Sequence, residues 1–588
     1  MLKSLKIYRW LFALCVALAG CDILEPVNDN HATLDRVYQN PTFAEGVLMA
    51  AYTRLPTNSL SFNDVATDDA VTNNKLNDYL RMATGQWSSI YNPVGQWNNS
   101  IAAIQSLNQF LAVIDTVNWK GSVPELNWMY TQRFKGEAYA LRALFQYHLL
   151  VTVAGPGANG QLLGIPIFDR LLDVRDNFNL PRATFEESVA QIYADMDRSL
   201  GYLTMNDYRN ISNTSQLPKG YEHVSVVNYN IIFGQELNQR ISARMVKALR
   251  ARLALLAASP AFNPNNNASL WAKTADYAGA SLQELGGLAG LDPAGHRFYL
   301  KSLVDAVNVS ASTPIDQKEI LWRSSVVNSN SREQAHFPPS LFGRGNVNPT
   351  QNLVDAFPAA NGYPIDHPQS QYDPATPYAN RDPRLRLYIA YDGNTFSGRT
   401  LRTGVGGGVD AKDSVETSTR TGYYLKKLLV EEVNLNPVSM TTQKHYEVHM
   451  RYTELFLIYA EAANEAWGPD GAGTWGFSAR EVVAAIRKRA GITQPDSYLT
   501  SITTKEEMRK LIRNERRLEL CFEGFRFWDL RRWKENLAEP AKGININRTN
   551  LTVVDVEPRV YNNNYMHYGP IPETEVVKYN ALIQNKGW

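Results

Sequence analysis

The 588-residue sequence predicts a mainly α-helical protein, built from degenerate tetratricopeptide-like helical hairpins with long loop-rich insertions. Three observations lead to this fold class. Apolar residues recur at helical spacing in many segments. Alanine-rich segments follow one another in pairs across tight breaks, and two long stretches show no helical pattern. The tetratricopeptide period of about 34 residues is not regular, so we expect degenerate repeats.

Helical signals appear in order along the chain. Asn40 and Pro41 predict a helix start, because asparagine is a good N-cap and proline suits the first helical position. Apolar stripes at helical spacing then follow at 101–114, 134–149, 189–203, 245–256, 271–282, 452–463 and 482–489. The stretches 57–97 and 316–445 are instead rich in Asn, Gly, Pro, Thr and aromatic residues. Long loops in compact proteins are usually functional or disordered, and their aromatic residues argue against disorder.

The N-terminus has the order of a secretory signal. Lys3, Lys6 and Arg9 precede an apolar stretch at 10–18, which is too short to span a membrane. The ending "LAGC" resembles the lipobox of bacterial lipoproteins, which predicts lipidation of Cys21. Several acyl chains on one residue give stable anchoring. The alternative is a plain secretory signal with an incidental cysteine.

The cysteines and the N-terminal pattern set the expected domain organisation. Cys15 leaves with the signal and Cys21 carries lipid, so Cys521 is alone and no intramolecular disulfide is expected. The expected organisation is a lipoprotein signal peptide at 1–20, a lipid-anchored tether at 21–40 and a single domain at 41–588, with insertions at about 57–97 and 316–445.

Overall charge argues against a nucleic-acid-binding protein. The formal net charge is +1 and the hydrophobic content is 44%, as in an ordinary globular protein. Binding to a phosphate backbone needs an excess positive field, which this balance does not provide. The segment "NERRLELCFEGFRFWDLRRW" at 514–533 is nevertheless dense in charges and rings. It is open to three interpretations: a catalytic box, a nucleic-acid-binding stripe or a half-buried helix.

Helical periodicity favours the half-buried helix for this segment. Three glutamates share one face at four-residue spacing: Glu515, Glu519 and Glu523. Like charges at that spacing repel one another unless countercharges intervene. Arg516, Arg517 and Arg526 are expected to supply those countercharges and to tie the helix to loops through bidentate pairs. The neighbouring apolar face consists of Leu511, Leu518, Phe522 and Phe525.

No motif in the sequence supports catalysis or cofactor binding. In "HYEVH", His445 and His449 have a spacing that can hold a metal on a helix, but no third ligand is evident. The glycine-rich stretch 404–408 lacks a phosphate-binding pattern. Asp68 and Asp69 are adjacent in one loop, which does not establish the carboxylate separation of a glycosidase. We therefore predict no enzyme activity, no metal site and no cofactor.

The segment 514–533, extended by the preceding arginine, is similar to the C-terminal signature of the SusD/RagB family. This family comprises the surface nutrient-binding lipoproteins of Gram-negative glycan users. Further segments match the family in order: "GEAYALRALFQYHLL", "GIPIF", "PRATFEESVAQIYADMDRSL", "NPTQNLVDAF", "NRDPRL", "TGYYLKKL", "RYTELFLIYAEAANEA", "AIRKRAGI" and the ending "GPIPETEV…NALIQNKGW". The matches run from the lipobox to Trp588, so the resemblance covers essentially the whole chain.

The resemblance implies a SusD-like α/α superhelix of four tetratricopeptide-like hairpins with a loop-rich second half, and it implies no catalysis. The implied function is capture of an oligosaccharide at the surface of the outer membrane. The protein would act as a lipid-anchored lid that delivers the ligand to a SusC-like, TonB-dependent barrel. Two alternatives stay open: peptide capture, as in some relatives, and a structural lid with little affinity of its own.

Sugar binding needs aromatic faces that stack on C–H groups and polar side chains that bond to hydroxyls. The 69–98 region supplies both, and its candidates are Asp69, Asn73, Asn74, Tyr79, Arg81, Trp87, Tyr91, Trp97 and Asn98. The alternative for Trp87 and Trp97 is that they cover the core beneath a long loop. A second candidate cluster consists of Arg332, Gln334, His336, Phe337 and Phe342, with Asn328 and Asn330 beside it.

Overall fold

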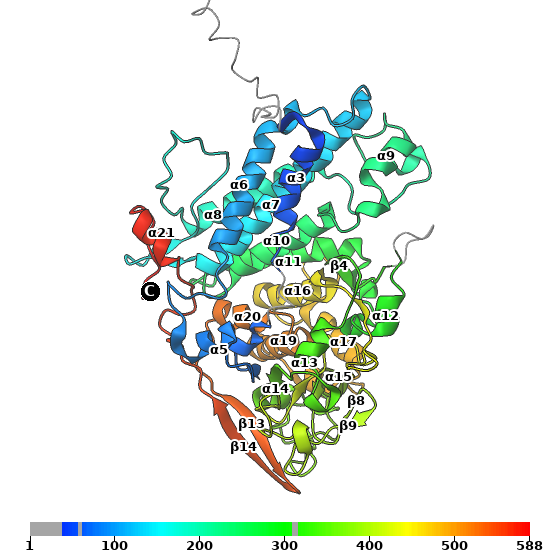
Figure 1. Ribbon diagram of the computed structural model, residues 1–588, viewed down its shortest axis with the longest axis vertical. Coiled ribbons are helices and arrows are strands. Elements are labelled where there is room, and N and C mark those ends of the chain that lie inside the picture. The colour runs from blue at the N-terminus through cyan, green and yellow to red at the C-terminus, as the bar shows by residue number, and fades with distance from the viewer. Residues whose placement is uncertain (1–37, 57–61, 309–315) are drawn as a thin grey trace, which may run out of the picture.

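The computed structural model describes residues 38–56, 62–308 and 316–588. Figure 1 shows long helices in its upper half and a loop-rich region in its lower half. The predicted mainly α-helical fold is confirmed. The predicted signal peptide, Cys21 and most of the expected tether lie outside the described residues.

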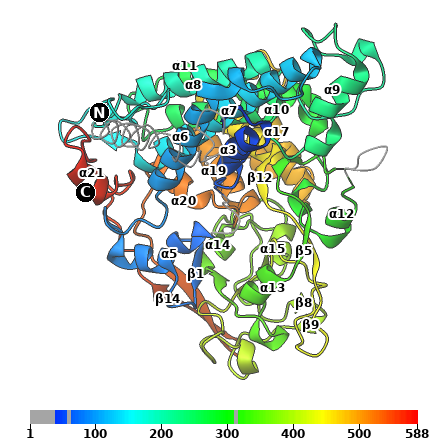
Figure 2. The ribbon, with the colours of Figure 1, turned by 45° about the horizontal axis from the view of Figure 1, so that its top comes forward.

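Long helices follow the predicted apolar stripes. The first group is α3 (Pro41–Tyr52), α6 (Trp97–Val113), α7 (Pro124–Val153), α8 (Phe185–Tyr202), α10 (Ala243–Ala258) and α11 (Ala268–Glu284). The second group is α16 (Tyr452–Trp467), α17 (Ala479–Ala490) and α19 (Lys505–Glu519). Neighbours in the first group pack against one another, and α11 packs on α16, which in turn contacts α17 and α19. The helices therefore form one continuous layered scaffold (Figures 1 and 2).

Local sequence signals fix where several helices begin. The Asn40 side chain accepts hydrogen bonds from the N–H groups of Thr42 and Phe43, at 3.0 and 3.3 Å, so the predicted N-cap is confirmed. At α8, Thr184 and Glu187 form a reciprocal capping box. These contacts satisfy N–H groups that would otherwise lack an acceptor in the first helical turn.

The two largest hydrophobic cores among the described residues underlie the two halves of the molecule. The first lies between the scaffold helices and includes Leu107, Leu141 and Leu249. The second lies beneath the loop-rich half and includes Tyr388, Tyr423 and the lone Cys521. Burial raises the pKa of the Cys521 thiol to about 12.

The two predicted insertions contain mainly irregular backbone and short elements. The first contains β1 (Ala70–Thr72) and α5 (Asp78–Arg81), and its last residue, Trp97, already begins α6. The second contains the short helices α13 (Ser331–His336), α14 (Gln351–Ala356) and α15 (Pro383–Tyr388). Its strands are β4 (Ile320–Arg323), β5 (Val327–Ser329), β6 (Val347–Pro349), β7 (Ile389–Ala390), β8 (Thr395–Phe396), β9 (Arg399–Thr400), β10 (Tyr424–Leu425) and β11 (Gln443–His445).

All named sheets in the described part of the chain are two-stranded. The antiparallel pairs are β1 with β6, β7 with β10, β5 with β11, β8 with β9, β4 with β12 (Val448–Arg451), β2 (Gly155–Pro156) with β3 (Leu162–Leu163), and β13 (Ala541–Asn547) with β14 (Asn550–Glu557). The β13–β14 hairpin extends away from the scaffold in Figure 1. The remaining α-helices are α9 (Val226–Phe233), α12 (Lys301–Asp305), α18 (Ser497–Ser501), α20 (Arg526–Arg532) and α21 (Glu573–Lys578). Among the described helices, none has both the length and the apolar character needed to cross a membrane.

The charged segment 514–533 supplies carboxylates to a buried ion-pair network whose cations come from other parts of the chain. Glu519 is fully buried, and its carboxylate contacts Arg489 Nη2 at 2.7 Å and Arg384 Nη1 at 3.0 Å. Glu523 contacts Arg451 Nε and Lys427 Nζ, each at 2.7 Å. Burial alone would raise the pKa of Glu519, but Arg489, Arg451 and Arg384 hold it well below its usual range. The structural interpretation of this segment is therefore confirmed.

The expected source of the countercharges is wrong. Arg516 pairs with Asp529, at 2.8 Å, and Arg517 and Arg526 pair with the aspartates of the first insertion. The glutamates are neutralised by cations from other segments, because α19 turns this face toward the loop-rich half. The prediction that the segment forms a single helix is also wrong. The helix α19 ends at Glu519, and Phe522 has a positive φ of 62°, so Glu523 follows a turn.

Removing Glu519 should destabilise the fold. We expect Glu519→Ala to lower the free energy of unfolding by about 3–5 kcal/mol, because its buried arginine partners lose their compensating charge. The control is Glu506→Ala on the same helix, since that carboxylate is exposed and lies 3.9 Å from its nearest cation. Urea unfolding followed by circular dichroism measures both variants, and equal stability for the two would contradict the network's role.

A buried aspartate should make stability depend on pH. Burial and the nearby Asp69 raise the pKa of Asp64 to about 7. One oxygen of Asp64 accepts from the Phe522 N–H at 3.3 Å, and the other has no partner among the described residues. Because the folded-state pKa exceeds the unfolded one, ionising Asp64 costs stability progressively as pH rises from about 4 to 7, and the cost stays constant above that range.

Asp64→Asn mimics the protonated carboxyl and should remove this cost. We expect a higher melting temperature than wild type at pH 8 and little difference at pH 4, measured by calorimetry. Asp115→Asn, at an exposed carboxylate, is the control for a general charge effect. A gain of equal size at both pH values would show that Asp64 is ionised throughout.

Candidate functional site

The strand pair β1–β6 brings the two candidate clusters together. Ala70 lies opposite Pro349 and Thr72 lies opposite Val347, so the first insertion is joined to the second. Asn73 extends this junction, because its side-chain amide donates to the carbonyls of Arg344 and Gly345, each at 2.9 Å. Asn73 is therefore held by backbone groups, whereas the neighbouring Asn74 is exposed.

Asp69 has a structural environment. It is fully buried, and its carboxylate accepts from Arg517 Nε at 2.7 Å. Its neighbour Asp68 makes a bidentate pair with Arg526, at 2.9 and 2.8 Å. Burial opposes ionisation of Asp68, yet Arg517 and Arg526 lower its pKa well below the usual range. These pairs attach the first insertion to α19 and α20. The prediction that arginines of the charged segment tie it to loops through bidentate pairs is therefore confirmed for Arg526.

The two tryptophans of the first cluster lie inside the protein. Trp87 is 4% exposed and packs edge-on against Phe527, Tyr561 and Trp588. Trp97 is 6% exposed and belongs to the scaffold core, because it opens the amphipathic helix α6. Neither ring presents a free face to solvent. The sequence shows no helical pattern over 57–97 and so predicts no helix that would bury these rings. This prediction is wrong for Trp97, which begins α6.

The other residues of the first cluster lie nearer the surface. Tyr79, Arg81 and Tyr91 are half-buried, and Asn98 is exposed. The Tyr91 hydroxyl donates to Asp78 Oδ1 at 2.7 Å, which fixes its ring across the start of α5. The first cluster is therefore divided between core, ion-pair and surface positions, and it does not form one aromatic platform.

The second cluster is also divided. Arg332 pairs with Glu447 and donates to the Leu428 carbonyl at 3.0 Å. His336 is buried against the Phe62 ring, and Phe337 is buried in the second core. Gln334 is exposed. Phe342 differs from all of these, because 54% of its surface is exposed and its φ is +64°.

The backbone at Phe342 is strained. A bulky residue rarely adopts a positive φ, and such strain persists only where the surrounding structure imposes it. At Phe342, the Gly343 N–H donates to the Pro338 carbonyl and the Arg344 N–H donates to the Gln334 carbonyl. These bonds close the turn and hold the Phe342 ring outward.

Phe342 borders a cavity of about 650 Å³, here called the outer cavity. Its walls are residues 299–301 before and at the start of α12, residues 337–342, the β8–β9 hairpin and residues 426–436. Lys426 Nζ lies 3.1 Å from Glu431 Oε1, and the Ser397 N–H donates to Glu431 Oε2 at 2.8 Å. Arg399 donates to the Ser340 carbonyl at 3.1 Å. The outer cavity thus combines one exposed ring with fixed polar groups of both charges.

Sequence reasoning found Phe337 and Phe342 but missed the opposite wall of this cavity. The available signal was the segment "KKLLVEEVNLN" at 426–436, where paired charges and asparagines follow one another without helical spacing. Only the fold places this segment beside Phe342.

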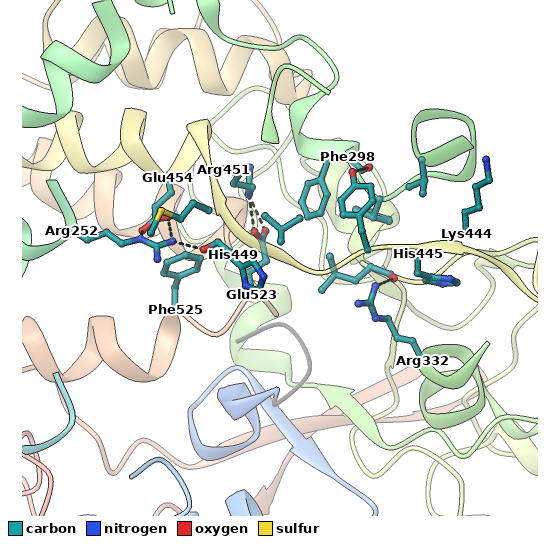
Figure 3. Close-up of a pocket in the computed structure, with 16 residues that line it drawn as sticks. Arg252, Phe298, Arg332, Lys444, His445, His449, Arg451, Glu454, Glu523 and Phe525 are labelled. Carbon is teal, nitrogen blue, oxygen red and sulfur yellow. Dashed lines mark hydrogen bonds and ion pairs between the residues drawn. The ribbon is translucent and has the colours of Figure 1, made fainter. Parts of the chain in front are cut away.

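A second pocket, drawn in Figure 3, is too small for a sugar. Its volume is about 30 Å³, which is about the space of one water molecule. Its walls carry the ion pairs Arg252–Glu454 and Arg451–Glu523 (Figure 3). These charges are already paired, so the pocket belongs to the ion-pair network.

The two histidines considered for a metal site lie on separate strands. His445 ends β11 and contacts Glu333 Oε1 at 2.9 Å, whereas His449 is in β12 with its ring against Trp322. The helix that their spacing required is absent at 443–451. Among the described residues, no group of three metal-ligating side chains comes together.

Comparisons with known proteins agree with the fold. The family model described as "SusD family" matches residues 316–588, and the one described as "Starch-binding associating with outer membrane" matches residues 25–216. The SusD-like protein P38 of Formosa agariphila is 26% identical over 424 residues, which are 69% of this chain and 67% of that protein.

Solved structures show the same architecture at low sequence identity. A SusD-like protein from Bacteroides fragilis has a TM-score of 0.70 at 21% identity, covering 96% of this chain and all of that one. A second protein from the same species, titled a SusD-like carbohydrate-binding protein, has a TM-score of 0.66 at 19% identity, covering 93% and 99%. The ordered motifs, the two family models and the shared fold agree, and the chain belongs to the SusD/RagB family.

Proposed function

We propose that this protein binds an oligosaccharide at the cell surface and passes it to a SusC-like, TonB-dependent barrel in the outer membrane, without catalysing a reaction. Family membership supports binding, because one matching model is described as starch-binding and associated with the outer membrane. A structural neighbour is titled a carbohydrate-binding protein. The observation that carries the proposal for this chain is the outer cavity, where the exposed Phe342 ring faces a polar wall.

The chemistry of the outer cavity suits a sugar. A pyranose ring has an apolar C–H face that packs on an aromatic ring, and Phe342 provides such a ring with few rotatable bonds to immobilise. Hydroxyl groups need both donors and acceptors, and Lys426, Arg399 and Glu432 supply both at the walls. Because Lys426 and Arg399 are already held by other contacts, little side-chain freedom is lost on binding.

Delivery to a barrel rests on the family and on the N-terminal sequence. The lipobox at 18–21 supports a lipid anchor at Cys21, with residues 1–20 as signal peptide, 21–40 as tether and 41–588 as one binding domain. An anchored protein with the proposed role needs a membrane-spanning partner to move the ligand inward. The proposed partner is therefore a SusC-like barrel that this protein covers at the cell surface.

Phe342→Ala should weaken oligosaccharide binding by about tenfold, because an aromatic contact is worth roughly 1–1.5 kcal/mol. Calorimetry with an oligosaccharide selected from a glycan array gives the affinity. Phe178→Ala is the matched control, since Phe178 is similarly exposed, at 44%, and does not line the outer cavity. Unchanged binding by Phe342→Ala would place the site elsewhere, and peptide binding without any glycan binding would favour the peptide alternative.

Cys21→Ala should detach the protein from the membrane. Wild type is expected to fractionate with the outer membrane and to bring a SusC-like barrel through purification in mild detergent. The variant is expected to be released or to remain uncleaved, because the acylated thiol is missing. Fractionation with immunoblotting measures both. Membrane retention of a correctly processed variant would contradict lipid anchoring, and wild type recovered alone beside an expressed barrel would contradict the partner.

A further inference from the structure

A second large cavity opens between the helical scaffold and the C-terminal charged segment. This inner cavity has a volume of about 460 Å³. Three of its walls are the end of α7 with Tyr147, His148 and Val151, the end of α10 with Leu255 and Leu256, and the segment that carries Phe525 and Trp528. Its size is within the range of small-molecule sites, roughly 300–1,000 Å³. It shares Arg252, Glu454 and Phe525 with the small pocket of Figure 3.

Three polar groups on the cavity wall lack protein partners. The Tyr147 hydroxyl, the His148 ring and the Trp528 indole N–H make no hydrogen bond to other described residues. Tyr147 and His148 keep partly exposed surface although they lie on the central helix α7, because the cavity opens beside them. Trp528 is likewise only partly buried, so all three polar groups are open to the cavity and available to a bound ligand.

Charge on the same wall is biased toward positive. Arg252 pairs with Glu454 at 2.7 Å, Arg516 pairs with Asp529, and Arg532 pairs with Glu461 and Asp529. Arg531 has no carboxylate partner. It donates to the Phe527 carbonyl at 3.0 Å, its Nε and Nη2 make no hydrogen bond, and it lies over the rings of Phe527, Trp87 and Tyr561.

The unpaired arginine makes the interior a favourable place for an anion. A cation in a low-dielectric interior produces a strong field over several ångströms. Burial lowers the pKa of Arg531 to about 10, and burial together with Arg252 lowers the pKa of His148 to about 3. His148 is therefore neutral and presents one donor and one acceptor. At the mouth of the cavity, the exposed Arg54 adds another positive charge.

We propose that the inner cavity binds a small organic anion. Its carboxylate accepts hydrogen bonds from Tyr147, His148 and Trp528, and its ring-shaped apolar body packs against Phe525 and Leu256. This site is separate from the outer cavity, since the two share no lining residue. The inference therefore does not depend on the proposed capture of oligosaccharides.

The test uses sodium benzoate as the probe and the full-length protein, with benzyl alcohol as a neutral ligand of similar shape. Calorimetry at matched sodium chloride should give saturable benzoate binding with a Kd of about 1 mM or below. Benzyl alcohol should bind at least about tenfold more weakly, because it cannot use the positive field. Absence of saturable benzoate binding, or equal binding of the two ligands, would overturn the proposal.

Two variants locate the bound anion. Tyr147→Phe removes one hydroxyl and should weaken benzoate binding by about fivefold, the loss of one hydrogen bond. Trp528→Phe should have an effect of similar size for the same reason. Tyr139→Phe is the matched control on α7, because its half-buried ring packs against Tyr202 and does not line the inner cavity. Wild-type affinity in both Tyr147→Phe and Trp528→Phe, confirmed as folded by circular dichroism, would overturn the assignment to this cavity.

Discussion

The buried carboxylate of Glu519 is the contact on which the rest of this structure depends. Glu519 ends α19 and meets Arg384, Arg451 and Arg489, which come from the second insertion, the β12–α16 junction and α17. One carboxylate thus joins the helical scaffold to the loop-rich half. A buried charge is costly unless it is compensated, so separating these segments from Glu519 would be strongly unfavourable.

The first insertion is fixed by the same kind of contact. Asp68 and Asp69 accept from Arg517 and Arg526, and the backbone beside them pairs with β6. These contacts explain why a stretch with little helix has a defined conformation. They also explain why Asp69, a candidate ligand-binding residue, is buried and paired with Arg517 and does not face solvent.

The two cavities differ in the way their polar groups are arranged. In the outer cavity, polar side chains are fixed by neighbours and border one exposed ring, an arrangement suited to a ligand with many hydroxyl groups. In the inner cavity, donors without protein partners and an uncompensated arginine lie on walls that are both polar and apolar. The outer cavity therefore favours recognition of a ligand by its shape and hydrogen bonds, whereas the inner cavity favours a ligand with a negative charge.

The sequence by itself determined the helical scaffold, because helix formation depends on local periodicity and capping that can be read within a few turns. The Asn40 N-cap and the apolar stripes appear in the structure at their predicted places. The ordered motifs likewise determined the family. The structural role of 514–533 followed from its spacing of glutamates and apolar residues, but the segment is more deeply buried than the half-buried helix that the spacing predicted.

Only the tertiary structure decided which charges pair and which rings are exposed. Glu519 finds its cations more than twenty residues away along the chain, so no local rule could choose Arg384 over Arg516. Trp87 and Phe342 both looked like candidate platforms, yet one is covered by C-terminal rings and the other is held outward by a strained turn. Burial and long-range pairing depend on the packing of distant segments, and this is the information that local sequence patterns lack.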